Sequence, residues 1–297
     1  MTMPDGHSNR DTAAAGAPSM PLTVTFDLED NRSSTAQEPR FVAMSHRFLD
    51  FLQQRGIRAT VFVVGELACA SPELVRRVAE DGHEIGLHGL RHVALEDVGP
   101  LRLRGELERG RGLLEDVAGV AVRGFRAPIF SLTPGSGWAV EEIAAAGFGY
   151  SSSVLPASNP LHGWPGAPRG PYRWSNGLLE LPCPVAGTGR LRVPFLGGIY
   201  LRYFPPMLSR RLVRGFAATA ILWSYVHPYD IDTDEPFFVM PHAGWLVSRL
   251  VHTRRSATLP RLDAALAACG GPGRPLGELA CELETEELPQ VDPGEGR

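Results

Sequence analysis

The sequence predicts an α/β fold built around a mostly parallel sheet. Short apolar runs rich in β-branched and aromatic residues alternate with longer stretches in which apolar residues recur at helical spacing. In chain order these are a strand, a helix, a strand, a helix and a strand, at residues 22–26, 40–54, 59–64, 71–81 and 84–87. Strands that alternate with helices in this way pair in parallel, because each helix returns the chain through a right-handed crossover.

The first two predicted helices have recognisable ends. Residues 40–54 carry apolar side chains on one broad face, and Gly56 follows as the residue that ends the helix. In the second helix, Ser71 is the expected N-cap and Pro72 takes the first helical position, where its missing N–H costs nothing. Gly82 then ends that helix and leads into the next strand.

The second half of the chain continues the alternation. Further helices are expected at residues 101–118, 138–146, 206–215 and 253–268, and further strands at 124–128, 150–154, 178–181 and 220–226. We therefore expect a single domain over residues 21–269 that ends in a helix. Residues 1–20 are small and polar, and residues 270–297 are acidic and rich in proline and glycine, so both ends are expected to be disordered.

Composition excludes several classes of protein. The formal net charge is −4, from 29 basic and 33 acidic residues, and no basic stripe is present, which argues against a nucleic-acid partner. No stretch approaches the roughly 18 apolar residues that span a bilayer, and the N-terminal region lacks the apolar core of a secretory signal. We therefore expect no transmembrane segment and a cytoplasmic location, at most peripheral to the membrane. The four cysteines form no CxxC pair and are expected to be free thiols.

Polar residues stand where the predicted strands end. Asp27, Glu29 and Asp30 follow the first strand, and His88 and His92 follow the third. Because the carboxyl ends of parallel strands share one rim, these side chains are expected to meet. Two histidines and one carboxylate form a three-ligand zinc site with an open position for water. The plain alternative is an acidic loop beside two surface histidines.

Two more polar residues belong to the same expected rim. Arg126 follows a later strand and His227 follows the last one. A second carboxylate could take the proton of the metal-bound water, Arg126 could orient that carboxylate, and His227 could protonate a leaving amine or alkoxide. This set suits hydrolysis of an amide or ester without a covalent intermediate. No Gly-x-Ser-x-Gly elbow is present, so a serine hydrolase is not expected.

The region 157–177 is rich in proline, glycine and large aromatic residues. Trp164, Tyr172 and Trp174 offer flat surfaces on which sugar rings could stack, which makes them candidate substrate-binding residues. Ordinary core packing explains the same residues equally well. His83 precedes a buried strand, and a structural role is expected for it.

Taken together, the motifs resemble those of the polysaccharide deacetylases of the NodB-homology group, carbohydrate esterase family 4. The branch they resemble is associated with bacterial exopolysaccharide loci and is related to the allantoinase-like deacetylases. The resemblance extends over residues 22–268. The matching stretches are residues 25–30, 59–65, 82–92, 124–128, 147–153 and 225–228. The resemblance implies a deformed (β/α)7 barrel, an Asp-His-His site for a divalent metal, most often Zn²⁺, and removal of N-acetyl or O-acetyl groups from a glycan.

Residue roles follow from the same resemblance, position by position. His88 and His92 correspond to the two metal histidines, and Asp27 corresponds to the catalytic base. Arg126 corresponds to the arginine that tethers the base, and His227 to the acid near the leaving group.

The third metal ligand departs from the common family pattern. Many relatives have two adjacent aspartates after the first strand, and here Leu28 fills the second place. A subgroup uses Asp-x-Asp, which makes Glu29 the ligand, and strand alternation agrees because Asp27 and Glu29 point the same way. Asp30 is the alternative if the strand has already turned.

Three functions are compatible with these residues. The first is a metal-dependent deacetylase that acts on an N-acetylated polysaccharide or its lipid-linked precursor. The second is a small-molecule amidohydrolase, such as a cyclic-amide hydrolase of the same fold. The third is a glycan-binding protein with a decayed site, suggested by Leu28, by Ser151 where relatives often have aspartate, and by Ile129 where many have tyrosine. The retained histidines and Arg126 favour an enzyme.

Overall fold

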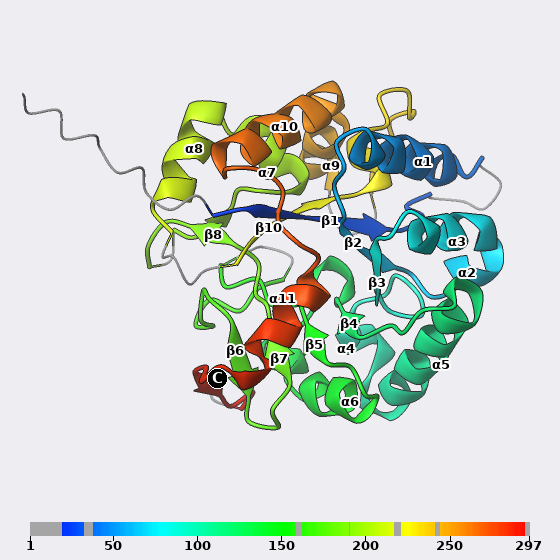
Figure 1. The fold of residues 1–297 in the computed structure, drawn as a ribbon, viewed down its shortest axis with the longest axis vertical. Coiled ribbons are helices and arrows are strands. Elements are labelled where there is room, and N and C mark those ends of the chain that lie inside the picture. The colour runs from blue at the N-terminus through cyan, green and yellow to red at the C-terminus, as the bar shows by residue number, and fades with distance from the viewer. Residues whose placement is uncertain are drawn as a thin grey trace, which may run out of the picture.

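A nine-stranded sheet lies at the centre of the molecule, in the order β10-β1-β2-β3-β4-β5-β7-β6-β11 (Figure 1). This computed structural model describes residues 20–32, 38–158, 162–189, 191–216, 221–240 and 244–294. The strands of the sheet are β1 (Leu22–Leu28), β2 (Thr60–Val63), β3 (Glu84–Leu87), β4 (Gly124–Phe125), β5 (Tyr150–Ser151), β6 (Tyr172–Trp174), β7 (Leu179–Glu180), β10 (Leu222–Val226) and β11 (Gln290–Val291).

The seven neighbouring strands from β10 to β7 all pair in parallel. Only β6 runs antiparallel to its neighbour β7, and β11 closes that edge by pairing in parallel with β6. Two short strands, β8 (Val185–Ala186) and β9 (Val193–Pro194), form a separate antiparallel pair. This arrangement confirms the expected α/β class and is consistent with a deformed (β/α)7 barrel.

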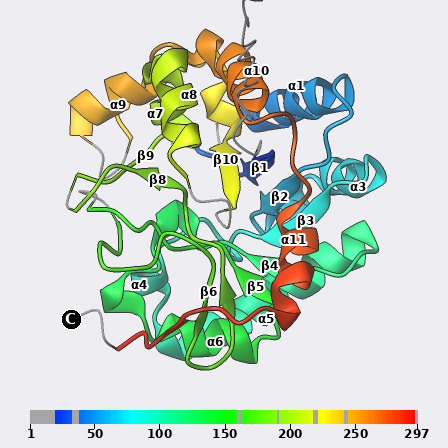
Figure 2. The same ribbon diagram turned by 60° about the vertical axis from the view of Figure 1, so that its left-hand side comes forward.

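Helices form an outer layer around the sheet, as Figures 1 and 2 show. They are α1 (Arg40–Gln53), α2 (Leu67–Ala70), α3 (Pro72–Glu80), α4 (Leu95–Val98), α5 (Pro100–Ala118), α6 (Ala139–Ala145), α7 (Gly198–Tyr203), α8 (Pro206–Arg214), α9 (Gly244–His252), α10 (Thr258–Ala268) and α11 (Leu276–Glu282). The helix expected over 253–268 is shorter than predicted, since α9 ends at His252 and α10 begins at Thr258. None of the described helices is long and apolar enough to cross a membrane.

The sheet is buried under this layer, which explains its sequence pattern. All seven residues of β1 are buried, and Phe26 stacks on Phe48 of α1 with 4.5 Å between ring centroids. Strands covered on both faces read as continuous apolar runs, because neither face meets water. Polar side chains at the end of such a strand are therefore carried into the interior, where they need partners.

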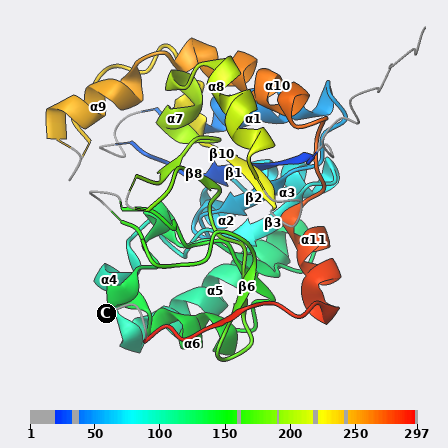
Figure 3. The same cartoon turned by 90° about the vertical axis from the view of Figure 1, so that its left-hand side faces the viewer.

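The end of the chain differs from the expectation for residues 270–297. Instead of a disordered tail, this segment forms α11 and β11. The N–H of Leu276 donates to Thr60 Oγ1 at 2.7 Å, and Leu276 is fully buried. Figure 3 shows α11 on the side of the molecule opposite α9. The overall composition of this segment predicted disorder wrongly, because Leu276, Leu279 and Ala280 supply one apolar helix face within a polar segment.

The expectation for residues 1–20 falls outside the described part of the chain, apart from Met20.

Candidate active site

Glu29, His88 and His92 form the one candidate metal-binding group among the described residues. Oε2 of Glu29 lies 2.5 Å from Nε2 of His92 and 3.6 Å from Nε2 of His88. The three ligand atoms all lie within 4.8 Å of one another. β1 brings Glu29 to this point, and β3 ends directly before His88. Two imidazole nitrogens and one carboxylate oxygen are the donor set of a three-ligand zinc site.

The surroundings of these atoms fit a metal. Nδ1 of His88 lies 2.9 Å from the carbonyl oxygen of Arg126. With Nδ1 donating to that carbonyl, the lone pair of Nε2 is directed toward Glu29, which is how a backbone contact selects the tautomer of a metal ligand. Within the described part of the chain, Oε2 of buried Glu29 has no aligned hydrogen-bond donor. A cation between these three side chains would satisfy that oxygen.

Charge around Glu29 is consistent with an ionised ligand. Burial raises the pKa of its carboxyl group, but His92 and His88 outweigh burial and hold the pKa well below its usual value. Asp30, the other candidate third ligand, does not join this group. Its carboxylate pairs with Arg32 at 2.6 Å and is partly exposed. The strand β1 ends at Leu28, and Asp30 is not part of the group formed by Glu29 and the two histidines.

Arg126 links the base candidate to the barrel interior. Its Nη1 donates to Oδ1 of Asp27 at 2.6 Å and to Thr25 Oγ1 at 2.7 Å. Its remaining nitrogens donate to the carbonyl oxygen and hydroxyl of Ser152, both at 3.1 Å. The guanidinium is fully buried, and its carbon lies 4.1 Å from the centre of the Phe62 ring. Such a planar, fully partnered cation fixes the position of the Asp27 carboxylate.

His227 lies near the oxygen of Asp27 that Arg126 does not bind. Its Nε2 is 3.7 Å from Oδ2 of Asp27, and its Nδ1 is 2.7 Å from Oδ2 of Asp230. Asp230 in turn pairs with buried Arg202 at 2.9 Å. Burial lowers the pKa of His227, but Asp230, Glu29 and Asp27 outweigh burial and raise it to about 9. Sequence reasoning missed Asp230 and Arg202, although Asp230 stands only three residues after His227.

These groups open into one cavity of about 500 Å³. Asp27, Glu29, His88, His92, Arg126 and His227 all line it. Ile129 also lines this cavity, and its φ is +51°, followed by Phe130 at +53°. A left-handed conformation is rare for a β-branched residue, and strain of this kind is concentrated at functional sites. In the sequence, the only indication that Ile129 belongs to the site was its position directly after the Arg-Ala-Pro motif.

The predicted sugar-stacking residues do not reach the cavity. Trp164, Tyr172 and Trp174 are all buried, at 3% exposure or less. Their rings pack on one another, with centroids 5.1 Å apart for Trp164 and Trp174 and 5.0 Å for Tyr172 and Trp174. The substrate-binding prediction for these three residues is therefore wrong, and the packing alternative holds.

The structural expectation for His83 agrees with the structure, since its Nδ1 accepts from the N–H of Ala59 at 3.1 Å.

Comparison with known families divides the chain into two consecutive matches. Residues 16–146 match the family described as "Polysaccharide deacetylase". Residues 152–270 match the family described as "Domain of unknown function (DUF3473)". The cavity draws on both matched regions: Asp27, the metal-binding group and Arg126 lie in the first, and His227 with Asp230 lies in the second.

Similar proteins carry deacetylase names. A peptidoglycan-N-acetylglucosamine deacetylase from Bacillus cereus is 33% identical over 97 residues, which cover 32% of this chain and 35% of that protein. A chitooligosaccharide deacetylase from Sinorhizobium fredii is 33% identical over 117 residues, which cover 39% of this chain and 49% of that protein. The chain thus spans less than half the length of these two curated relatives.

A solved structure with the same fold also bears this family name. The probable polysaccharide deacetylase from Pseudomonas aeruginosa superimposes with a TM-score of 0.58 at 16% identity, covering 90% of this chain and 92% of that one. At this identity the likeness concerns the fold, which agrees with the parallel sheet described above.

Proposed function

The chain contains a polysaccharide deacetylase domain of the NodB-homology, carbohydrate esterase family 4 type, and from this premise we propose that it is a metal-dependent hydrolase that removes acetyl groups from an N-acetylated carbohydrate. The observation that carries the proposal is the pairing of two groups in one cavity. Glu29, His88 and His92 offer three donors that could hold a metal ion, and Asp27, held by Arg126, lines the same cavity. Metal-assisted amide hydrolysis uses a metal that activates water together with a base that takes the proton of that water.

Glu29, His88 and His92 would hold a divalent cation, and their donor set fits Zn²⁺ best. When bound, this metal lowers the pKa of a water molecule and polarises the acetyl carbonyl. The contact of His88 with the Arg126 carbonyl keeps one ligand oriented before the metal arrives.

Asp27 is the proposed general base. It takes a proton from the attacking water while its other oxygen stays on Arg126, at 2.6 Å. Because Arg126 is buried and fully partnered, the carboxylate has little freedom to turn away from the water. The oxygen of that water forms the new bond to the acetyl carbon.

His227 is the proposed general acid. With its pKa raised to about 9, the imidazole is protonated at neutral pH and can donate to the sugar nitrogen. The carbon–nitrogen bond then breaks, the amine leaves with that proton, and acetate is left behind. Nε2 of His227 and Oδ2 of Asp27 are 3.7 Å apart, so the proton that Asp27 gained can return to His227.

A small-molecule amidohydrolase is the second candidate. The aromatic side chains expected to stack on a glycan are buried, and a cavity of about 500 Å³ is a size that suits a compact amide. We retain the carbohydrate as first choice because the two relatives are named as deacetylases of peptidoglycan N-acetylglucosamine and of chitooligosaccharides. An exopolysaccharide or its precursor is the proposed carbohydrate, and action on the cytoplasmic side is proposed with it.

The test combines metal content with acetate release. The purified protein is assayed for bound metal by elemental analysis, and acetate release is measured from a panel of N-acetylated oligosaccharides and from cyclic amides. About one zinc per chain with metal-dependent acetate release is the expected result. Metal with turnover of cyclic amides alone would replace the carbohydrate by the small-molecule substrate. Absence of metal after zinc is supplied would contradict both enzymes and favour a glycan-binding protein with a decayed site.

A further inference from the structure

One wall of the catalytic cavity is apolar. It is made by α7 and α9, which contact each other, and by the chain before α9. The residues of this wall are Ile199, Tyr200, Met240, Val247 and Val251. Apart from the phenol of Tyr200, none of them offers a hydrogen-bonding side chain to a sugar. A wall of this kind fits an apolar part of a ligand better than a second sugar ring.

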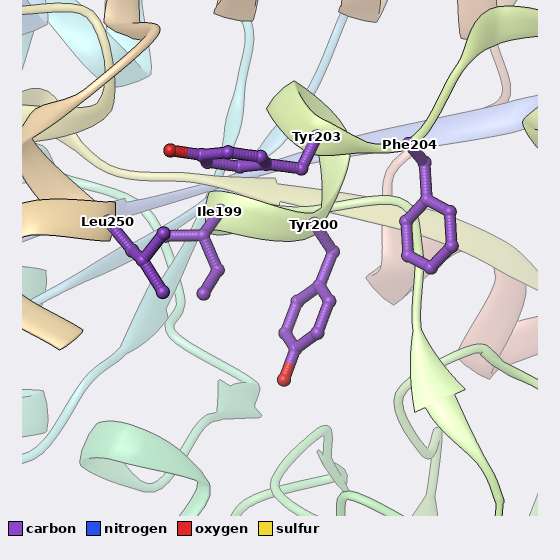
Figure 4. Close-up of a pocket in the computed structure, with 5 residues that line it drawn as sticks. All are labelled: Ile199, Tyr200, Tyr203, Phe204 and Leu250. Carbon is purple, nitrogen blue, oxygen red and sulfur yellow. The ribbon is translucent and has the colours of Figure 1, made fainter. Parts of the chain in front are cut away.

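A second cavity of about 290 Å³ adjoins this wall (Figure 4). Its lining residues are Ile199, Tyr200, Tyr203, Phe204 and Leu250. Ile199 and Tyr200 line both cavities, so the second cavity borders the catalytic one across these two residues. Figure 4 shows the Tyr203 ring beside Leu250 and Ile199, while the Tyr200 ring points away from the Tyr203 ring. Leu250 keeps 37% of its surface exposed, so an apolar group that enters this cavity can pack on it.

Positive charge flanks the second cavity. The guanidinium of Arg254 lies 5.2 Å from the centre of the Tyr203 ring, which lines this cavity. The guanidinium of Arg249 lies instead over the rings of Phe237 and Trp245, at 5.1 and 6.0 Å, and neither of these rings lines the cavity. Both arginines are exposed. Neither forms an ion pair with a carboxylate among the described residues, whereas Arg255 in the same segment is paired with Glu235 at 2.8 Å. An anion beside the apolar cavity would complement the charge of Arg254.

We propose that the substrate is an amphiphile, in which the N-acetylated sugar is joined through a phosphate to an alkyl or prenyl chain. This inference rests on the proposed deacetylase function. The acetamido group lies at Asp27 and the metal-binding group, the apolar chain lies in the cavity of Tyr203, Phe204 and Leu250, and the phosphate lies near Arg254. Burial of the alkyl or prenyl chain adds affinity in proportion to the apolar area removed from water.

Three monomeric probes test the proposal with the zinc-loaded protein. They are the methyl glycoside of N-acetylglucosamine, its 1-phosphate, and the decyl ester of that 1-phosphate, each used below its micelle concentration. We expect kcat/KM for acetate release to be about tenfold or more higher for the decyl ester than for the 1-phosphate, mainly through KM. Equal values for the two phosphates would overturn the proposal but leave the deacetylase function in place. No acetate from any of the three, or from the oligosaccharide panel, would overturn the deacetylase function itself.

A binding measurement does not depend on turnover. Decyl phosphate, decanol and inorganic phosphate are titrated into the protein by calorimetry. Tightest binding of decyl phosphate is expected, since it alone engages both the cavity and Arg254. If inorganic phosphate bound as tightly as decyl phosphate, the protein would have a site for the anion but none for the alkyl chain, and the proposal would be overturned. Absence of binding by decyl phosphate would overturn it as well.

A matched pair of variants tests whether the alkyl chain of the substrate occupies the second cavity. Leu250→Glu places a charge in the second cavity, and Leu101→Glu makes the same change at a fully exposed position on α5. The ratio of kcat/KM for the decyl ester to that for the 1-phosphate should fall toward one in Leu250→Glu and keep its original value in Leu101→Glu. An unchanged ratio in both variants would overturn the assignment of the cavity. Arg254→Gln serves as a second variant and should weaken decyl phosphate binding more than decanol binding.

Discussion

Asp230 holds His227 through two contacts of one oxygen. Oδ2 of Asp230 accepts from the N–H of His227 at 3.0 Å and lies 2.7 Å from Nδ1 of its imidazole ring. The ring therefore presents Nε2 to Asp27 and to the cavity. A carboxylate behind an imidazole fixes its tautomer and favours its protonated form.

Replacing Asp230 should change the pH dependence of turnover. Burial alone lowers the pKa of His227, and Asp230 is the largest of the influences that raise it to about 9. Asp230→Asn removes that charge, so the pKa of His227 should fall. A general acid works in its protonated form, and activity is lost as the pH rises through its pKa. The alkaline limb of the kcat–pH profile is thus expected to move to lower pH.

Asp232→Asn is the control for this variant. Asp232 stands two residues later and pairs with Arg40 at 2.7 Å, so its loss should leave the alkaline limb in place. Removal of Asp230 also leaves buried Arg202 without its carboxylate, which should lower the free energy of unfolding by about 3–5 kcal/mol. The profiles are therefore recorded well below the melting temperature of the variant. An alkaline limb that does not move would show that His227 is not the titrating acid.

A second prediction concerns the third metal ligand. Glu29→Gln should lower the affinity for zinc by at least about tenfold, because a neutral amide oxygen replaces a charged donor. Asp30→Asn makes the same chemical change one residue later, where the carboxylate pairs with Arg32, and should leave the affinity unchanged. Zinc titration followed by elemental analysis measures both. Equal losses in the two variants, or a larger loss in Asp30→Asn, would reverse the assignment.

The choice between Glu29 and Asp30 shows where sequence reasoning reached its limit. Alternation along a strand favoured Glu29, but the alternation applies only while the strand lasts. β1 ends at Leu28, so the direction of the next side chains depends on tertiary contacts. The strands themselves were predictable, because burial on both faces leaves an unbroken apolar run such as residues 22–26.

Features that depend on distant partners were less predictable. The strand expected over residues 150–154 ends at Ser151, since the N–H groups of Ser153 and Val154 donate to Glu180 at 2.7 and 2.9 Å instead of continuing the strand. Glu180 is remote in sequence and carries no local signal for this role. Arg202 was missed for the same reason, because its partner Asp230 comes from another element.

A third prediction separates the base from the metal site. Asp27→Asn should retain bound zinc and reduce kcat by about 10²–10⁴-fold, the usual contribution of a general base. Arg126 remains nearby to donate to the asparagine oxygen, so the fold should survive the change. Metal analysis and initial rates on one preparation test this prediction. Near-normal turnover would mean that another group accepts the proton of the water.

The last prediction tests the role of the buried aromatic cluster. Trp174→Ala removes a fully buried ring that packs on Trp164 and Tyr172, and large-to-small changes at such positions lower the free energy of unfolding by about 3–5 kcal/mol. KM for an N-acetylated substrate should stay within about twofold of its original value. A change in KM is expected only when a residue that contacts the substrate is removed, and Trp174 does not line the cavity. Trp245→Ala is the matched control, because Trp245 is 62% exposed and should cost little stability. If Trp174 contacted a sugar ring instead, KM would rise sharply while chemical denaturation gave nearly the original unfolding free energy. The rings are enclosed by the chain on every side, so we expect the loss to appear in stability.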